Sequence, residues 1–407
     1  MNVLNEKGLD AILAPANLRA AYLKVKANGG AAGVDGIGTG ELAAHIRKHW
    51  PGIEKKLQAG TYQPGLLKPV TIPKPGGGER ELSIPTTQDR LIQQAIAQPL
   101  GEVFDPLFSK YSYGYRRGKS AHDAVRKMKY FVTTKGKNWV VDVDIERFFD
   151  EVSHDILMHR ISREIKDKAV LRLIGTYLRT GKLVNNRKLR HTGRGIPQGG
   201  PLSPLLANIY LNPLDRELEV RGVSFARYAD DITLYVESRE EGEALLAEIV
   251  EWIEQKLKLR VNRKKSGVRP PEEGNFLGYR MEQGGKLALS RKSVEAFKAK
   301  VRHLLDARRP WRWDELKQRW QEYVRGWSQY FGLTEWSEPV DLSRWCRRHL
   351  RKLCWLRWHN WKGRRNALIR LGAKPHHVKA AHSSRGAWRM ARHGALHTVL
   401  NNQRLRD

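Results

Sequence analysis

Alternating apolar and polar residues predict a β-hairpin over residues 225–236. In its second strand, residues 232–236, branched apolar side chains alternate with Thr and Tyr, so one face of the strand is expected to pack on a core. The turn between the strands carries two adjacent carboxylates, Asp230 and Asp231. This pair is the first feature of the chain that indicates chemistry.

Adjacent carboxylates at a hairpin tip repel each other unless a cation lies between them. Their hard oxygen atoms suit Mg²⁺, which binds one or two carboxylates together with substrate phosphates. Paired aspartates are also common in solvated turns, but the run Tyr-Ala-Asp-Asp at 228–231, inside an apolar hairpin, is less usual. A two-metal site would need a third carboxylate.

Residues 139–145 supply candidates for this third carboxylate, because their alternation predicts another strand. Branched apolar residues line one face of this strand, whereas Asp142 and Asp144 lie on the other. Either carboxylate could complete a clamp for two metal ions on a phosphoryl-transfer path. Spacing alone does not choose between them.

The rest of the chain is predicted to be mainly helical, with two more hairpins. Residues 70–85 form a hairpin around a glycine-rich turn, where Lys74 and Arg80 could close over a triphosphate or could be simply solvated. A basic hairpin is expected over 182–194. Helices are expected over 18–25, 39–58, 90–99, 155–180, 204–218, 240–257, 297–305, 316–327 and 345–358.

The charge balance narrows the possible partners. The 407 residues include 74 Lys and Arg against 43 Asp and Glu, a net charge of +31. Such a surface favours a polyanion, because the release of counterions from phosphates would supply much of the affinity. From residue 342 onward there are 17 Lys and Arg but only one acid, Asp407, which indicates a phosphate-binding surface.

An acidic membrane is the competing partner, but the sequence shows no long apolar run, amphipathic anchor or lipidation motif. The first residues lack the basic and apolar regions of a signal peptide. Two cysteines, Cys346 and Cys354, argue against a disulfide scaffold or a four-cysteine zinc site. A cytoplasmic protein that handles nucleic acid, with no membrane partner, fits these observations.

Three segments resemble successive motifs of reverse transcriptases: residues 144–150, 195–210 and 228–231. Three motifs in this order are far more specific than any one of them. The motifs are most similar to those of the bacterial group II intron reverse transcriptase/maturase family, and the segment 316–331 resembles the thumb of that family. The segment 383–389 resembles the small DNA-binding tail of its compact class C form. The resemblance runs from about residue 15 to the C-terminus, although this family usually has proline where Arg117 stands.

The resemblance implies an α+β fold in the form of a right-hand polymerase. Its fingers and its palm, with an antiparallel sheet, would be followed by an all-helical thumb or maturase domain and a short basic tail. The implied boundaries are an N-terminal extension at 1–60, fingers and palm at 61–290, a thumb (X) domain at 291–375 and a DNA-binding tail at 376–407. The cysteine pairs of an HNH nuclease are missing around His359, so no endonuclease domain is expected.

The resemblance also implies which residues are catalytic. Asp144, Asp230 and Asp231 would hold two Mg²⁺ ions. Lys265 would protonate the departing pyrophosphate, although a lysine in a basic turn is usually only solvated.

Four further residues would form the nucleotide pocket. Lys74 and Arg80 would contact the phosphates of the incoming nucleotide. Phe149 would lie against the 2′-position of the sugar and favour deoxynucleotides, while Phe148 or Phe149 packs inward. Gln198 would contact the nucleotide or the templating base, beside glycines that permit close backbone approach to a ligand.

The implied function is that of an RNA-directed DNA polymerase, a nucleotidyltransferase that copies RNA into cDNA. Its partners would be an RNA template, a DNA primer, dNTPs, a DNA target site and the host group II intron RNA, whose splicing and retrohoming it would assist. One alternative is an intron-independent reverse transcriptase in DNA repair or defence. Another is a maturase that acts only as an RNA chaperone, against which the intact candidate site argues.

Overall fold

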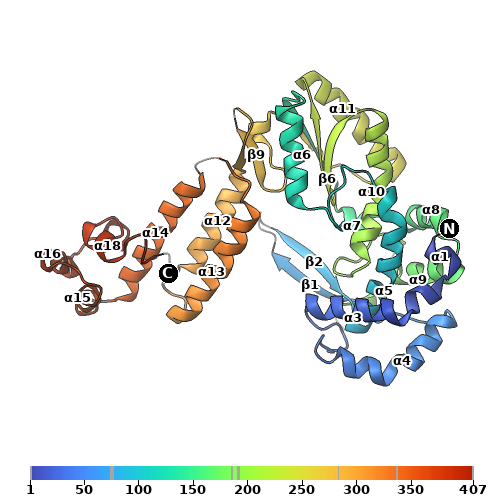
Figure 1. Cartoon of the computed structure of the whole chain (residues 1–407), viewed down its shortest axis with the longest axis horizontal. Coiled ribbons are helices and arrows are strands. Elements are labelled where there is room, and N and C mark those ends of the chain that lie inside the picture. Colours follow the sequence, from blue (N-terminus) through green and yellow to red (C-terminus); the bar gives the residue numbers. More distant parts are fainter. Residues whose placement is uncertain are drawn as a thin grey trace. The chain divides into compact units, whose positions relative to one another are not determined.

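The computed structural model describes residues 2–73, 78–184, 187–189, 193–282, 284–335 and 338–405. The chain divides into two compact units, Met1–Phe276 and Leu277–Asp407 (Figure 1). The first unit combines helices with an antiparallel sheet, and the second is almost entirely helical. The predicted α+β class is therefore confirmed.

The first unit begins with helices that precede a long β-hairpin. The predicted hairpin over 70–85 is present, although Lys74 at its turn lies outside the described residues. The elements of this part are α1 (Val3–Glu6), α2 (Leu9–Leu13), α3 (Pro15–Asn28), α4 (Leu42–Gln58), β1 (Lys68–Pro73), β2 (Glu79–Ile84), α5 (Thr87–Phe104), η1 (Asp105–Leu107) and α6 (Ala121–Thr133).

A buried carboxylate anchors the base of this hairpin to α5. Asp89 accepts hydrogen bonds from the hydroxyls of Tyr62, Thr86 and Tyr177 and from the backbone N–H of Gly65. Burial raises the pKa of Asp89, and the four donors oppose that rise. These bonds join the chain before β1 to the start of α5, so the hairpin has a fixed base.

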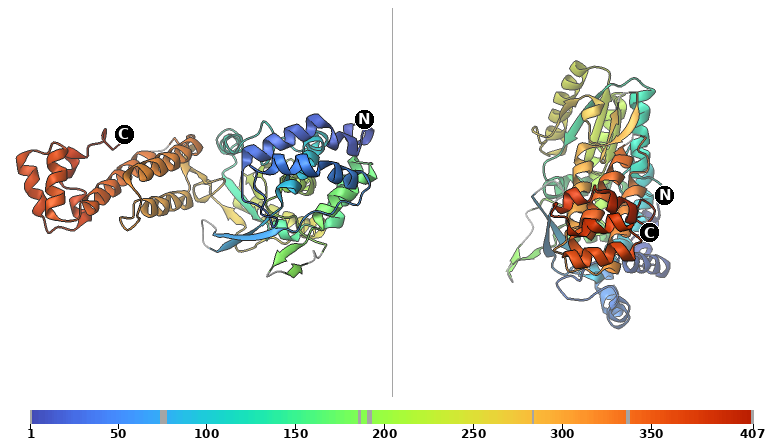
Figure 2. Two further views of the ribbon diagram at one scale, coloured as in Figure 1. Left: turned by 90° about the horizontal axis from the view of Figure 1, so that it is seen from below. Right: turned by 90° about the vertical axis from the view of Figure 1, so that its left-hand side faces the viewer.

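The central sheet of the first unit has four antiparallel strands in the order β6-β7-β3-β8. Its strands are β3 (Trp139–Asp144), β6 (Ser224–Tyr228), β7 (Asp231–Val236) and β8 (Gly267–Arg269). α11 (Arg239–Trp252) packs on β3, β7 and β8, whereas α6 packs on β6. In the right-hand view of Figure 2, these two helices flank the strands on opposite sides.

The two flanking helices change one expectation. The alternation along 232–236 predicts one buried face, but Thr233 and Tyr235 are also buried, at 0% and 1% exposure. The ring of Tyr235 lies 5.3 Å from the ring of Phe131 on α6. The second face is therefore covered as well, by an element that is remote in sequence.

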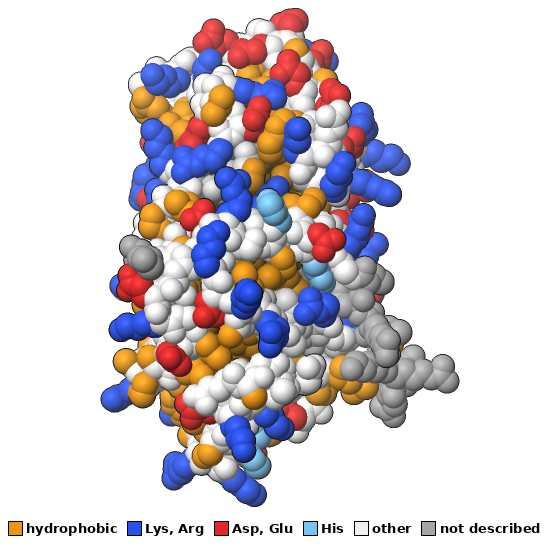
Figure 3. Space-filling model, turned by 90° about the vertical axis from the view of Figure 1, so that its right-hand side faces the viewer, with side chains coloured by type: hydrophobic (Ala, Val, Ile, Leu, Met, Phe, Trp, Pro, Cys, Tyr) orange, Lys and Arg blue, Asp and Glu red, His pale blue; other side chains and the backbone are white. Residues whose placement is uncertain are grey.

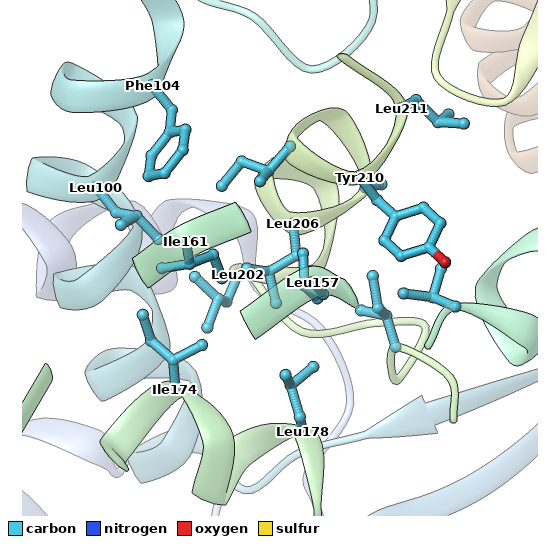
Figure 4. Close-up of a cluster of buried hydrophobic side chains, with 14 of the residues drawn as sticks. Leu100, Phe104, Leu157, Ile161, Ile174, Leu178, Leu202, Leu206, Tyr210 and Leu211 are labelled. Carbon is cyan, nitrogen blue, oxygen red and sulfur yellow. The ribbon is translucent and has the colours of Figure 1, made fainter. Parts of the chain in front are cut away.

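Helices and a small hairpin complete the first unit. They are α7 (Phe148–Glu151), α8 (His154–Glu164), α9 (Lys168–Leu178), β4 (Lys182–Val184), β5 (Arg187–Leu189), α10 (Ser203–Val220), the π-helical η2 (Ile253–Leu257) and η3 (Pro271–Glu273). The single helix predicted over 155–180 is two helices, because Ile165 is extended and Asp167 caps α9 at the N–H of Val170. Figure 4 shows side chains of α5, α8, α9 and α10 meeting in the core.

The surface of the first unit is unevenly charged. In Figure 3, Lys and Arg side chains spread over most of the face, while acidic side chains gather at the top, where α11 lies in Figure 1. α11 contains several glutamates, among them Glu243, which pairs with Arg239, and Glu248, which pairs with Arg221. A polyanion would thus find the α11 side the less favourable one.

The second unit begins with a hairpin and continues as helices. Its elements are β9 (Tyr279–Glu282), β10 (Lys286–Leu289), α12 (Arg291–Leu304), α13 (Trp313–Tyr330), α14 (Glu338–Arg357), α15 (Trp361–Arg370), α16 (Pro375–Val378), η4 (Lys379–His382), α17 (Ala387–Met390) and α18 (Gly394–Val399). The helices predicted over 297–305, 316–327 and 345–358 are confirmed within α12, α13 and α14.

Among its described residues, two separate hydrophobic clusters hold the second unit together. The first joins α12, α13 and most of α14 around Phe297, Val301 and Leu316. The second joins the end of α14 to the short C-terminal helices and includes Trp355 and Met390. Residues after 376 therefore pack into a small core, and the division at 376 between thumb and tail remains a prediction.

Candidate active site

The predicted hairpin presents Asp230 and Asp231 at a tight turn between β6 and β7. Tyr228 and Asp231 are opposite each other in the register, so the turn consists of Ala229 and Asp230. Ala229 has a φ of 59°, in the left-handed region that costs a non-glycine residue roughly 1–2 kcal/mol. Something in the surroundings must therefore hold this conformation.

The sheet register separates the two candidates for the third carboxylate. Asp144 is directly opposite Asp231 on the neighbouring strand, at the end of the sheet. Asp142 is opposite Thr233, and its Oδ2 lies 3.0 Å from Nε of Arg269. The geometry thus favours Asp144, because Asp142 is already engaged farther along the strand.

Two adjoining cavities of about 480 and 700 Å³ lie beside the turn. Asp144 and Lys265 line the larger of them. Both cavities are lined by the same four candidates from the sequence, namely Arg80, Phe149, Gln198 and Asp230. Residues from four distant parts of the chain therefore meet at one place.

The cavity changes the electrostatics of Asp230. Burial is the main effect that raises the pKa of its carboxyl group, and the nearby Asp144 carboxylate adds to the rise. The guanidinium of Arg80 on β2 opposes it. A further cation at this point would relieve the repulsion between the carboxylates.

Lys265 lies beside the same carboxylates. Its Nζ is 3.7 Å from Oδ2 of Asp144. The loop that carries Lys265 is tied to β3, because Asn262 donates its N–H to the carbonyl of Asp144 and Ser266 accepts the N–H of Asp144. The lysine is therefore held at the wall of the cavity.

The carboxylate set has the right donors for Mg²⁺, although it is not gathered into a closed ligand group. Within the part of the chain that the structure describes, no three His, Cys, Asp or Glu side chains lie close enough together to hold a metal ion. Asp144 and Asp231 nevertheless face each other at the end of the sheet, next to Asp230. Hard oxygen donors on a rigid sheet suit a magnesium site.

The structure separates the roles of the two adjacent phenylalanines. Phe148 is buried, at 2% exposure, and its ring lies 6.3 Å from that of Tyr210. Phe149 lines both cavities, with its ring 5.2 Å from that of Phe148. Phe148 also contributes to the wall of the larger cavity, so Phe149 is the one of the two rings that lines both.

Gln198 is held through its own backbone. The N–H of Ser83 on β2 donates to the carbonyl of Gln198 over 2.7 Å. Gly199, with a φ of 122°, lies so close to this strand that a Cβ would meet the Ser83 carbonyl at 3.1 Å. The close approach predicted for the glycines is therefore made in this structure to the protein's own backbone.

Tyr115 belongs to the cavity but was not among the predicted site residues. It has a φ of 60°, is 52% exposed and lines the smaller cavity together with Asp230. Burial and the Asp230 carboxylate raise the pKa of its hydroxyl. Its place in a basic, glycine-punctuated loop was the only signal in the sequence.

The N-terminal helices also reach the cavity. Asn28 and Gly29, at the end of α3, line it together with Arg90 of α5. Arg90 donates to the carbonyls of Gly29 and Ala31. No motif indicates this contact, because it joins a loop to a helix some sixty residues away.

The fold and the sequence comparisons agree on the class of protein. Residues 72–281 match the reverse transcriptase (RNA-dependent DNA polymerase) family, and the chain belongs to that family. Residues 294–372 match the maturase-specific domain of group II introns. The protein is thus a reverse transcriptase of the group II intron reverse transcriptase/maturase type, and the predicted right-hand polymerase fold is confirmed.

Curated relatives support this assignment. Protein YkfC of Escherichia coli is 31% identical over 287 residues, which cover 61% of this chain and 75% of YkfC. The group II intron-encoded protein LtrA of Lactococcus lactis is 36% identical over 209 residues, or 50% of this chain and 34% of LtrA. An uncharacterised 91 kDa protein in a cob intron of Schizosaccharomyces pombe is 38% identical over 164 residues, or 40% of this chain.

The matched segments differ in how much of each relative they represent. This chain spans a third of LtrA and a fifth of the cob intron protein.

Among the described residues, no helix combines the length and the apolar character that crossing a membrane requires.

Proposed function

We propose that this chain copies an RNA template into cDNA by extending a DNA primer with dNTPs, and that Asp144, Asp230 and Asp231 hold two Mg²⁺ ions. The observation that carries the proposal is the position of Asp144, opposite Asp231 and on the cavity that Asp230 also lines. Bound Mg²⁺ would lower the pKa of the primer 3′-hydroxyl and neutralise charge on the triphosphate.

The remaining cavity residues have roles that follow from their chemistry. Arg80 offers guanidinium donors to the triphosphate, and Lys74, which lies outside the described residues, would add an ammonium by the family resemblance. Phe149 lies where it would contact the 2′-position of the sugar. Gln198 presents its amide to the base, and Lys265 gives a proton to the departing pyrophosphate.

We also propose that the chain binds a host group II intron RNA and assists its splicing and its retrohoming into a DNA target. The maturase-specific match and the basic second unit support this part. Trp388 is 37% exposed, with Arg348 and Arg392 at 5.5 and 5.9 Å from its ring, an arrangement that suits stacking on nucleotides. We further propose that the protein acts in the cytoplasm, the location expected from the sequence.

Primer extension on an RNA template tests the polymerase proposal, with Asp144→Asn and Asp142→Asn as a matched pair. The two residues lie on one strand, and each substitution removes one negative charge. We expect Asp144→Asn to lose at least about a thousandfold in rate. Asp142→Asn should remain within a few-fold of wild type in rate.

Equal losses in the two variants would show that the register does not define the metal site. A folded wild-type protein that makes no cDNA would overturn the polymerase proposal and favour the RNA chaperone. In that case the protein would still bind intron RNA and support splicing. Group II intron RNA sequences flanking the gene would argue against the intron-independent alternative.

A further inference from the structure

Arg227, two residues before the turn, is completely buried next to the active-site carboxylates. It lies on β6, and its exposure is 0%. Asp215 on α10 is equally buried and pairs with it through two hydrogen bonds, of 2.7 and 2.6 Å. Burial raises the pKa of Asp215, and the guanidinium opposes that rise.

Every N–H of the Arg227 guanidinium has an acceptor. Nε and Nη2 donate to the carboxylate of Asp215. Nη1 donates to Oδ1 of Asn208 over 2.9 Å and to the carbonyl of Ala229 over 2.8 Å. Nη2 also donates to Oγ of Ser112 over 2.8 Å. A guanidinium has five such donors, so the network is fully satisfied.

The network joins the catalytic turn to the loop that carries Tyr115. Asn208 donates from Nδ2 to the carbonyl of Gly114 over 2.8 Å, and its Oδ1 accepts from Arg227. Gly114 packs directly on the turn, because a Cβ there would meet the backbone N of Ala229 at 2.3 Å. Tyr115 follows Gly114 and has its ring 6.4 Å from that of Tyr228.

We propose that Arg227 is a positioning residue for the polymerase reaction. It holds the carbonyl of Ala229, and so keeps the turn that presents Asp230 and Asp231 in its left-handed conformation. The same network places Tyr115 at the wall of the nucleotide cavity. The inference rests on the polymerase proposal and adds to it the group that orients the metal-binding carboxylates.

The stability of the fold gives no simple reason for this ion pair. A buried pair of this kind is often no more stabilising than apolar residues of similar size. A lysine could not replace Arg227, since an ammonium has three donors and lacks the planar fork. Holding a strained turn depends on the number and direction of the donors of Arg227, whereas filling the core depends only on the size of its side chain. This difference separates a positioning role of Arg227 from a packing role.

The test uses the double variant Arg227→Met/Asp215→Leu, which replaces both charges with apolar side chains. Arg160→Met is the control, because Arg160 also donates to a carbonyl of α10, that of Tyr210, away from the turn. Each protein is measured for its melting temperature, kcat, KM for dNTP and the Mg²⁺ concentration that gives half-maximal rate.

We expect the folded double variant to lose about a hundredfold in kcat, and the half-saturating Mg²⁺ concentration to rise about tenfold. KM for dNTP should change much less, because Arg80 and Phe149 are untouched. Arg160→Met should lower the melting temperature without changing the Mg²⁺ requirement. A folded double variant with wild-type kcat and Mg²⁺ requirement would overturn the proposal.

If the double variant does not fold, Asn208→Ala decides the question. It removes one acceptor from Arg227 and the bond to Gly114, while the ion pair remains. We expect a raised Mg²⁺ requirement, and an unchanged one refutes the positioning role. Loss of cDNA synthesis in the wild type itself would instead refute the polymerase proposal.

Discussion

Phe148 and Phe149 show that a shift of one position along the chain changes the surroundings of a side chain. The two rings are adjacent in sequence and chemically identical, yet Phe148 is buried and reaches only the larger cavity, whereas Phe149 lines both cavities. Sequence reasoning chose Phe149 through its place in a motif, and expected one ring of the pair to pack inward. The direction of each ring follows from the short helix α7, which begins at Phe148.

We predict that Phe149→Ala will let the enzyme accept ribonucleotides. Removal of the ring opens space at the sugar 2′-position, so the preference for dNTP over rNTP should fall by about 10–100-fold. The ratio of kcat/KM for dCTP and CTP measures this. Phe149→Tyr keeps the ring and should preserve the preference, and an unchanged ratio in the alanine variant would exclude Phe149 as the gate.

At the level of helices and strands, local hydrophobic patterns did not predict every boundary or every buried face. Hydrophobic spacing predicted most helices, but it merged α8 and α9, since three residues with Asp167 as a cap are enough to end one helix and start another. It also predicted only one buried face for β7, whereas both faces are buried. The second face is covered by α6, through contacts that no local pattern encodes.

Helix α14 carries a histidine that should make the second unit sensitive to acid. The ring of His349 lies 4.0 Å from that of Trp345 and 5.0 Å from that of Trp388. Burial, with the nearby cations Lys352, Arg302 and Arg348, lowers its pKa from 6.5 to about 4. The folded chain therefore holds this imidazole neutral at pH values where the unfolded chain protonates it.

We predict that the stability of this unit falls as the pH drops from about 6.5 toward 4, since the unfolded chain takes up the proton first. Above pH 6.5 the contribution is fully present. Ten of the thirteen tryptophans lie between 311 and 388, so tryptophan fluorescence during denaturant unfolding of the full chain reports on this region. His349→Gln should unfold with a shallower pH dependence, and equal slopes in both proteins would contradict the assignment.

At the scale of the whole molecule, the net charge of +31 is distributed unevenly. The acidic residues of α11 gather on one part of the first unit (Figure 3), whereas the second unit is strongly basic. The charge therefore indicates both the kind of partner and the surfaces that bind it. Its effect on binding should be strongly dependent on salt.

We predict that Arg385→Gln/Arg389→Gln will weaken RNA binding and flatten its salt dependence. Both side chains are exposed in the basic C-terminal region. If each contacts one phosphate, the slope of log K against log salt should decrease by about 1.4–1.8. Filter binding of an RNA fragment at several salt concentrations measures this slope.

The matched control is Arg239→Gln/Lys256→Gln, which removes the same number of charges from α11 and from η2, which follows it. Both of these side chains are exposed, and Arg239 pairs with Glu243 on the same helix. The control should bind RNA with the wild-type slope. If both pairs changed the slope equally, net charge rather than a defined surface would govern binding.

The sequence by itself determined the class of this protein. The order of the reverse transcriptase motifs, the Asp-Asp hairpin and the basic segment from residue 342 onward are local or compositional features, so they can be recognised without any fold. Helical periodicity likewise predicted α12, α13 and α14 of the second unit, but not the shorter helices that follow. Such features depend on residues that are close together along the chain.

Only the tertiary structure decided how distant segments meet. The motif resemblance had already implied Asp144, and the strand register gave an independent physical reason to favour it over Asp142, because pairing with β7 fixes which residue is opposite Asp231. Tyr115 and Arg227, far apart in the sequence, come together through α10, because its Asn208 bonds both to Gly114 and to Arg227. The acceptors of a buried guanidinium are determined by packing across the fold, and no spacing along the chain encodes them.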